Sequence, residues 1–143
     1  MEKIKVKLID GGKMPEYKTE GAACCDCYAR LAVPFITIPK KTRVLIALGF
    51  CIELPQGYEA VIRPRSGMTK KGVDVAIGTI DSDYRNEVMC QFINDSDGDF
   101  DIKNLDRICQ MKIQKAKQFE FMQVDELSET ERGQNGFGST GIN

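Results

Sequence analysis

The sequence contains no histidine and no tryptophan among its 143 residues. Without an imidazole, the chain cannot form the Ser/His/Asp or Cys/His sites of many hydrolases, or a zinc site that uses histidine. A base that works near neutral pH must then be a carboxylate, a lysine amine or a cysteine thiolate. The missing histidine therefore narrows the catalytic chemistry before any motif is considered.

Long apolar runs and a large excess of one charge are also missing. The longest apolar stretch, residues 44–52, is interrupted by Gly49 and is too short to span a bilayer. The first residues contain no apolar signal core. A formal net charge of -1 provides no basic field for a nucleic acid polymer. We therefore expect a cytoplasmic protein, or a nuclear one in a eukaryotic host, with neither membranes nor nucleic acid polymers as partners.

Cysteine is present, but its spacing does not indicate a metal centre. The six cysteines are Cys24, Cys25, Cys27, Cys51, Cys90 and Cys109. The first three form a CCxC run that lacks a second CxxC pair, so the signal for a metal site is weak. The other three lie in apolar, strand-like runs, where a buried free thiol is the usual state. We expect reduced structural thiols in a reducing compartment.

Strand signals recur at intervals of about 8–12 residues, separated by Gly, Pro or Asn-Asp turns. The predicted strands cover residues 4–8, 26–31, the segment between Pro34 and Pro39, 43–54 with a bend near Gly49, 58–62 paired back onto it as a hairpin, 107–112 and 119–124. No amphipathic helix exceeds about two turns. This pattern predicts one all-β domain, a barrel or a sandwich.

The central stretch of the chain is predicted to be a tight β-hairpin that carries a carboxylate. Gly78 allows a backbone to approach a ligand closely. Residues 79–80 favour a strand, residues 81–83 favour a turn, and residues 88–93 alternate as a return strand. Such a hairpin can hold a small flat ligand by its backbone groups, with Asp81 as a candidate base.

Two other stretches carry groups that bind phosphates. The tripeptide at 65–67 combines an arginine, a hydroxyl and an open backbone N–H at the start of a short helical turn. Residues 132–141 place one arginine, one aromatic ring and two hydroxyls among glycines. Together with Asp81, these stretches indicate attack by water on a phosphate chain, with a divalent cation to neutralise its charge.

Five ordered motifs resemble those of the trimeric dUTP pyrophosphatase (dUTPase) family: residues 23–29, 64–67, 78–85, 106–110 and 132–141. The resemblance implies an all-β fold, a distorted jelly-roll or β-clip barrel, with a catalytic core at 1–124. A flexible glycine-rich arm at 125–143 would close over the active site. It implies a homotrimer with shared sites and Mg²⁺ carried mainly by the substrate phosphates. The reaction would convert dUTP to dUMP and pyrophosphate by water attack on the α-phosphate, limiting uracil in DNA and supplying dUMP for dTMP synthesis.

The same resemblance implies a role for each site residue. Asp81 would be the base, Tyr84 would lie under the deoxyribose and exclude a 2′-hydroxyl, and Phe137 would stack on uracil. Asp26 would act on Mg²⁺ indirectly, through water. The backbone of Gly78, Thr79 and Ile80 would read the uracil edges. The phosphates would be bound by Arg65, Ser66, Gly67, Gln110, Arg132, Ser139 and Thr140, and Gly138 would also bind the substrate.

The sequence departs from the family pattern at four positions where glycine is frequent: Cys24, Asn86, Leu105 and Asn135. Two alternatives to a dUTPase also stay open. A dCTP deaminase of the same fold family would need a further acid/base over the ring amine, and no residue is assigned to that role. A non-catalytic regulatory module would bind dUTP without releasing pyrophosphate.

Overall fold

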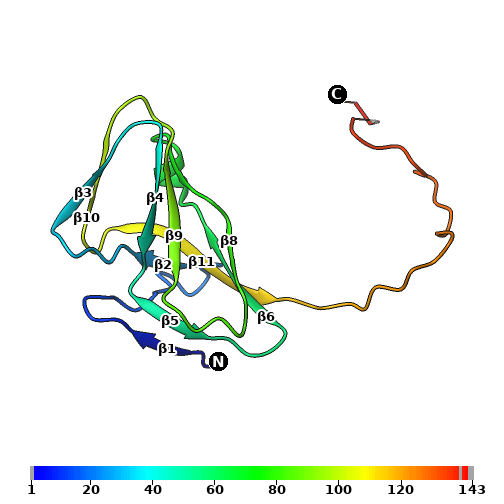
Figure 1. Ribbon diagram of the computed structural model, residues 1–143, viewed down its shortest axis with the longest axis horizontal. Helices are drawn as coiled ribbons and strands as arrows, with labels where there is room; N and C mark the ends of the chain where they lie inside the picture. The colour runs from blue at the N-terminus through cyan, green and yellow to red at the C-terminus, as the bar shows by residue number, and fades with distance from the viewer. Residues whose placement is uncertain (1, 139, 142–143) are drawn as a thin grey trace.

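A computed structural model describes residues 2–138 and 140–141 (Figure 1). Its elements are β1 (Lys5–Leu8), β2 (Cys25–Tyr28), β3 (Phe35–Ile38), β4 (Thr42–Ala47), β5 (Phe50–Glu53), β6 (Tyr58–Arg63), α1 (Ser66–Thr69), β7 (Val73–Val75), β8 (Gly78–Ile80), β9 (Met89–Asn94), β10 (Phe100–Lys103) and β11 (Arg107–Lys115). The predicted all-β fold with at most one short helix is confirmed. Within the described ranges, no helix is long and apolar enough to cross a membrane.

The strands form four sheets rather than one closed barrel: β1-β5, β10-β3, β2-β11-β6-β8 and β4-β9-β7. Every strand pair is antiparallel. The nine-residue strand β11 is the longest, and it pairs with β2 on one side and β6 on the other. At the end of β11 the chain leaves the body, as Figure 1 shows.

The core is built from the inward-facing residues of these strands. In the segment that leads into β9, Val88, Cys90 and Phe92 are buried while Met89 and Gln91 are exposed, as the alternation predicts. Burying each large apolar side chain stabilises the fold by about 1.5–3 kcal/mol. All six cysteines are free, and Cys25, Cys27, Cys90 and Cys109 are buried in this core.

The predicted strand at 43–54 is two strands, which is a correction. Gly49 separates β4 from β5 with φ +79, a left-handed conformation that favours glycine. A Cβ at Gly12 would lie 2.1 Å from the carbonyl oxygen of Gly49, so the two backbones can meet only because side chains are absent. The sharp turn sends β4 to pair with β9 and β5 to pair with β1.

Both predicted hairpins are wrong about which strands pair. Strand β6 pairs with β11 and β8, and not with β5. Strand β8 pairs with β6, whereas β9 pairs with β4 and β7, so the segment between β8 and β9 connects two different sheets. The strand at 26–31 is also shorter than predicted, because β2 ends at Tyr28.

The strand predicted at 119–124 does not form. Residues after β11 are extended and exposed, including Phe121 at 98%, Met122 at 82% and Leu127 at 87%. The hydrogen bond from Ala116 N to Gly57 O, 2.8 Å, is the last that joins the chain to the body in the described ranges. The described residues beyond it form the arm, which extends away from the body in Figure 1. The division into a core at 1–124 and a closing arm at 125–143 stays a prediction.

Leu105 is the only one of the four expected glycine positions that has a positive φ among the described residues, at +66. It lies in the turn between β10 and β11, where its N–H donates to the Ala29 carbonyl at 2.8 Å. Its side chain is 42% exposed, so it contributes little to the core. A left-handed conformation costs a non-glycine residue about 1–2 kcal/mol.

Replacing Leu105 with glycine should therefore stabilise the protein. The removed strain exceeds the extra unfolded-state entropy of glycine, about 0.5–1 kcal/mol, so we expect a net gain of roughly 0.5–1 kcal/mol in the free energy of unfolding. Urea unfolding at one fixed protein concentration measures it. Leu105→Ala is the matched control, because it keeps the Cβ and the strain. Equal stability of the glycine and alanine variants would contradict the explanation.

Candidate active site

The first group of predicted site residues meets on one face of the β2-β11-β6-β8 sheet. Gln110 of β11 lies directly opposite Asp26 of β2. The Asp26 carboxylate forms ion pairs with Arg65 Nε at 3.3 Å and with Arg107 Nη1 at 3.1 Å. We call Asp26, Arg65, Arg107 and Gln110 the arginine cluster. Its two cations and one carboxylate leave an excess of positive charge, which favours an anionic ligand.

The start of α1 is fixed beside this cluster. Gln110 Nε2 donates to the Pro64 carbonyl at 2.7 Å, and Arg65 Nη1 donates to the Arg107 carbonyl at 2.8 Å. The helix has no side-chain cap, and in the described chain the N–H groups of Ser66 and Gly67 donate no hydrogen bond. Free N–H groups next to two guanidinium groups form a suitable place for phosphate oxygens.

Arg107 is a member of the cluster to which sequence reasoning gave no role. The register between β11 and β2 shifts between Arg107 and Cys109, which is a β-bulge. Ile108 and Cys109 are both buried at this point, although they are consecutive. The extra residue places Arg107 and Gln110 on the same side of the sheet, although they are three positions apart. Two consecutive apolar residues, Ile108 and Cys109, are the sequence signal that could have indicated the bulge.

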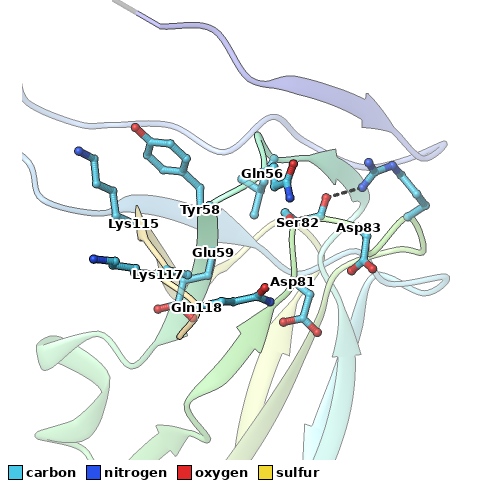
Figure 2. Close-up of a pocket in the computed structure, with 13 residues that line it drawn as sticks. Gln56, Tyr58, Glu59, Asp81, Ser82, Asp83, Lys115, Lys117 and Gln118 are labelled. Carbon is cyan, nitrogen blue, oxygen red and sulfur yellow. Dashed lines mark hydrogen bonds between the residues drawn. The ribbon is translucent and has the colours of Figure 1, made fainter. Parts of the chain in front are cut away.

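The second group lies on the loop between β8 and β9. Asp81, Ser82, Asp83 and Arg85 line an open groove of about 1070 Å³, together with residues 54, 56–59 and 115–118 (Figure 2). The loop is shaped by its own hydrogen bonds, from Tyr84 N to Asp81 O at 3.1 Å and from Arg85 Nη1 to Ser82 O at 2.7 Å. Asp81 is exposed, so its carboxylate is accessible to water and to a ligand.

Strand β8 leads into this loop and forms the edge of its sheet. Its residues Gly78, Thr79 and Ile80 pair with Ile62, Val61 and Ala60 of β6. Within the described residues, its other edge has no strand partner. The N–H and C=O groups on a free edge are available to another molecule. This arrangement is suited to the predicted reading of a base by backbone groups.

The third group lies on the arm. Arg132 Nε donates to the Asn135 carbonyl at 2.9 Å. Phe137 is fully exposed, and Thr140 is exposed. Gly138 has φ +88, a conformation that favours glycine. Ser139 lies outside the described residues.

The structure leaves the three groups apart. No hydrogen bond or ion pair joins the arginine cluster, the β8–β9 loop and the arm in the part of the chain that is described. These contacts therefore do not link the three groups within one chain.

The described residues contain no group of three or more Cys, Asp or Glu side chains that could hold a metal ion. Asp26 is the acidic residue that was predicted to act on Mg²⁺, and its two carboxylate oxygens are already paired with arginines. These residues do not form a cage of direct ligands. They fit a cation that arrives on a phosphate chain and meets Asp26 through water, as Mg²⁺ commonly does.

Comparisons with known proteins give a consistent result. A sequence profile of the dUTPase family matches residues 10–141. The deoxyuridine 5'-triphosphate nucleotidohydrolase of Orientia tsutsugamushi (strain Boryong) is 46% identical, over 98% of this chain and 99% of that protein. The enzyme of the same name from Treponema denticola is 48% identical, over 97% and 98%. A solved structure of the G164S mutant of the Staphylococcus bacteriophage 80alpha dUTPase with dUpNHpp has a TM-score of 0.92 and 23% identity, over 99% of this chain and 100% of that chain, so it shares the fold.

Proposed function

This chain belongs to the dUTPase family, and we propose that it hydrolyses dUTP to dUMP and pyrophosphate with Asp81 as the base. The observation that carries the proposal is the arginine cluster. Four side chains from three separate motifs meet beside the free N–H groups of Ser66 and Gly67. This combination of cations and backbone donors matches a triphosphate chain.

In the proposed reaction, Asp81 accepts a proton from water while the water oxygen bonds to the α-phosphorus. The bond between that phosphorus and its bridging oxygen breaks, and pyrophosphate leaves. Phosphoryl transfer of this kind depends mainly on positioning and on charge stabilisation. Arg65 and the N–H groups of Ser66 and Gly67 would bind the phosphate oxygens on which negative charge accumulates. Gln110, which already positions the loop at Pro64, would orient the chain for in-line attack.

Base and sugar would be recognised by the β8 edge and its loop. The edge groups of Gly78, Thr79 and Ile80 would hydrogen-bond to uracil, and the Tyr84 ring would exclude a 2′-hydroxyl. Phe137 would stack on the base, and Arg132, Gly138, Ser139 and Thr140 would bind the terminal phosphates. Mg²⁺ bound to the triphosphate would supply charge neutralisation, with Asp26 meeting it through water.

We propose that the site is completed in a homotrimer. The arm extends away from the body, and its Phe121, Met122 and Leu127 are almost fully exposed among the described residues. Large exposed apolar side chains in one segment usually mark a protein contact. If three chains exchange these arms around a three-fold axis, the separate groups of residues can meet between subunits and the ring closes.

Light scattering at micromolar concentration should therefore give three times the mass of one chain. The same preparation should hydrolyse dUTP, because shared sites require the assembly. A monomer with full activity would contradict the trimer while leaving the family assignment intact.

Pyrophosphate release tests the function itself. With Mg²⁺ present, dUTP should be turned over far faster than UTP, dTTP or dCTP. Ammonia released from dCTP would instead support a deaminase. Tight binding of dUTP without pyrophosphate release would support a regulatory module. The cytoplasmic location of the protein stays a prediction.

A further inference from the structure

The far end of the β8–β9 loop is attached to the body through the side chain of Glu87 and the backbone of Val88. The loop's internal hydrogen bonds fix its shape. Its position relative to the body depends on other contacts, since the two strands that it joins, β8 and β9, belong to different sheets. Beyond Glu87, the backbone of Val88 exchanges hydrogen bonds with Phe50 at 2.8 Å and with Leu48 at 3.0 Å. Glu87 therefore lies at the boundary between the loop and the rigid core.

The carboxylate of Glu87 accepts three hydrogen bonds from the body. Arg30 Nε donates to Oε1 at 2.7 Å and Arg30 Nη2 donates to Oε2 at 2.6 Å, a bidentate pair. Gly49 N also donates to Oε1, at 2.9 Å. The two side chains are 27% and 21% exposed, so water competes only partly for these bonds. The Arg30 hydrogen bonds lower the pKa of Glu87, so the carboxylate stays charged.

The backbone of the same residue holds the aromatic ring of the loop. The Tyr84 hydroxyl donates to the Glu87 carbonyl at 3.1 Å. The ring is therefore fixed at its Cα by the turn that starts at Asp81 and at its hydroxyl by Glu87. Arg30 and Gly49 hold Glu87 in place, and Glu87 in turn holds the Tyr84 hydroxyl. Loss of the bonds to Arg30 would therefore also loosen the Tyr84 ring.

We propose that Glu87, bound by Arg30, is a positioning residue that sets the place of the Tyr84 ring and with it the selectivity for deoxyribose. The inference rests on the proposed function, in which Tyr84 lies under the sugar. Glu87 acts through Tyr84 and makes no contact with the substrate. Exclusion of one hydroxyl requires a ring that cannot move aside, and the bidentate pair provides that rigidity.

Glu87→Gln keeps the size of the side chain and removes its charge, so the pair with Arg30 is lost. We expect kcat/KM for dUTP to fall by about 10–100-fold, as for a small misplacement of a positioning group. The kcat/KM for UTP should change less. The ratio of kcat/KM for dUTP to kcat/KM for UTP should therefore fall by about tenfold. Asp95→Asn is the control: it removes the exposed pair between Lys41 and Asp95, 3.4 Å, and should leave the ratio of the two kcat/KM values unchanged.

Two further variants keep the test decisive if Glu87→Gln does not fold. Arg30→Lys keeps the charge but loses the forked geometry. Tyr84→Phe keeps the ring and removes only its hydrogen bond to Glu87. Both should lower the ratio of kcat/KM for dUTP to kcat/KM for UTP. In the double variant, Tyr84→Phe should lower the ratio little beyond the effect of Glu87→Gln, because both substitutions act on one contact.

An unchanged dUTP/UTP ratio in the folded variants would overturn the inference. That outcome differs from failure of the proposed function, in which the wild-type chain itself releases no pyrophosphate from dUTP. Equal kcat/KM for UTP and dUTP in the wild type would remove Tyr84 from the sugar role, and the inference with it.

Discussion

Asp81→Asn should lower the turnover of dUTP by about 10²–10⁴-fold while leaving its binding nearly intact. Asparagine has almost the same size and keeps a carbonyl oxygen, but it cannot accept the proton from the attacking water. The loop should keep its shape, because its hydrogen bond from Tyr84 N uses the backbone oxygen of Asp81, not the carboxylate. Single-turnover kinetics, with the affinity for a non-hydrolysable dUTP analogue measured beside them, separate the two effects.

Asp83→Asn is the matched control for this experiment. Asp83 is also exposed and lines the same groove two residues further along the loop (Figure 2). It loses the same charge from the same surface, so a general electrostatic effect would appear in both variants. We expect turnover close to wild type for Asp83→Asn. Near-normal turnover for Asp81→Asn would remove Asp81 from the role of base.

Deleting the chain after Thr130 should leave a folded trimer with a much reduced kcat. In the described structure, residues 131–138 and 140–141 form only local hydrogen bonds within the arm, so the core loses nothing on truncation. The cut retains the apolar segment 119–127 that we assign to contacts between subunits. What disappears is the binding of the terminal phosphates and the stacking of Phe137 on uracil.

The free-energy balance explains why closure should depend on the substrate. Each ordered backbone residue costs roughly 1–2 kcal/mol of conformational entropy, and this stretch is rich in glycine. Charge-assisted bonds from Arg132 to phosphate contribute about 1.5–3 kcal/mol each, and stacking of Phe137 contributes about 1–3 kcal/mol. No single contact offsets the ordering cost, so the arm should order only when it contacts the intact triphosphate and should open when pyrophosphate leaves. A closed arm would also exclude water from the phosphates.

Amide exchange tests this directly. Amides at 131–141 should exchange more slowly with a bound dUTP analogue than in the free protein. Equal exchange in the two states would count against a lid. Full activity of the truncated chain would refute it altogether.

The sequence by itself determined the class of the fold and most of the candidate site. Alternation at 88–93 predicted a half-buried strand, and the punctuation by Gly and Pro predicted short strands with one helical turn. The missing histidine and the two phosphate-binding stretches indicated a carboxylate base and a phosphorylated substrate. The inferences about the fold succeed because side-chain periodicity and turn preference are local properties of the chain. The carboxylate base stays a prediction.

Only the tertiary structure decided which strands pair and which side chains meet. An alternating strand can satisfy its backbone groups against any partner, so the pattern at 58–62 could not reveal that β6 pairs with β11 and β8. The β-bulge that brings Arg107 to Asp26, and the pair between Arg30 and Glu87, likewise join residues far apart in sequence. Residues 119–124 show the converse. Their apolar side chains suggested a strand, but the described part of the chain offers them no neighbouring strand, and a strand exists only where another supplies its hydrogen bonds.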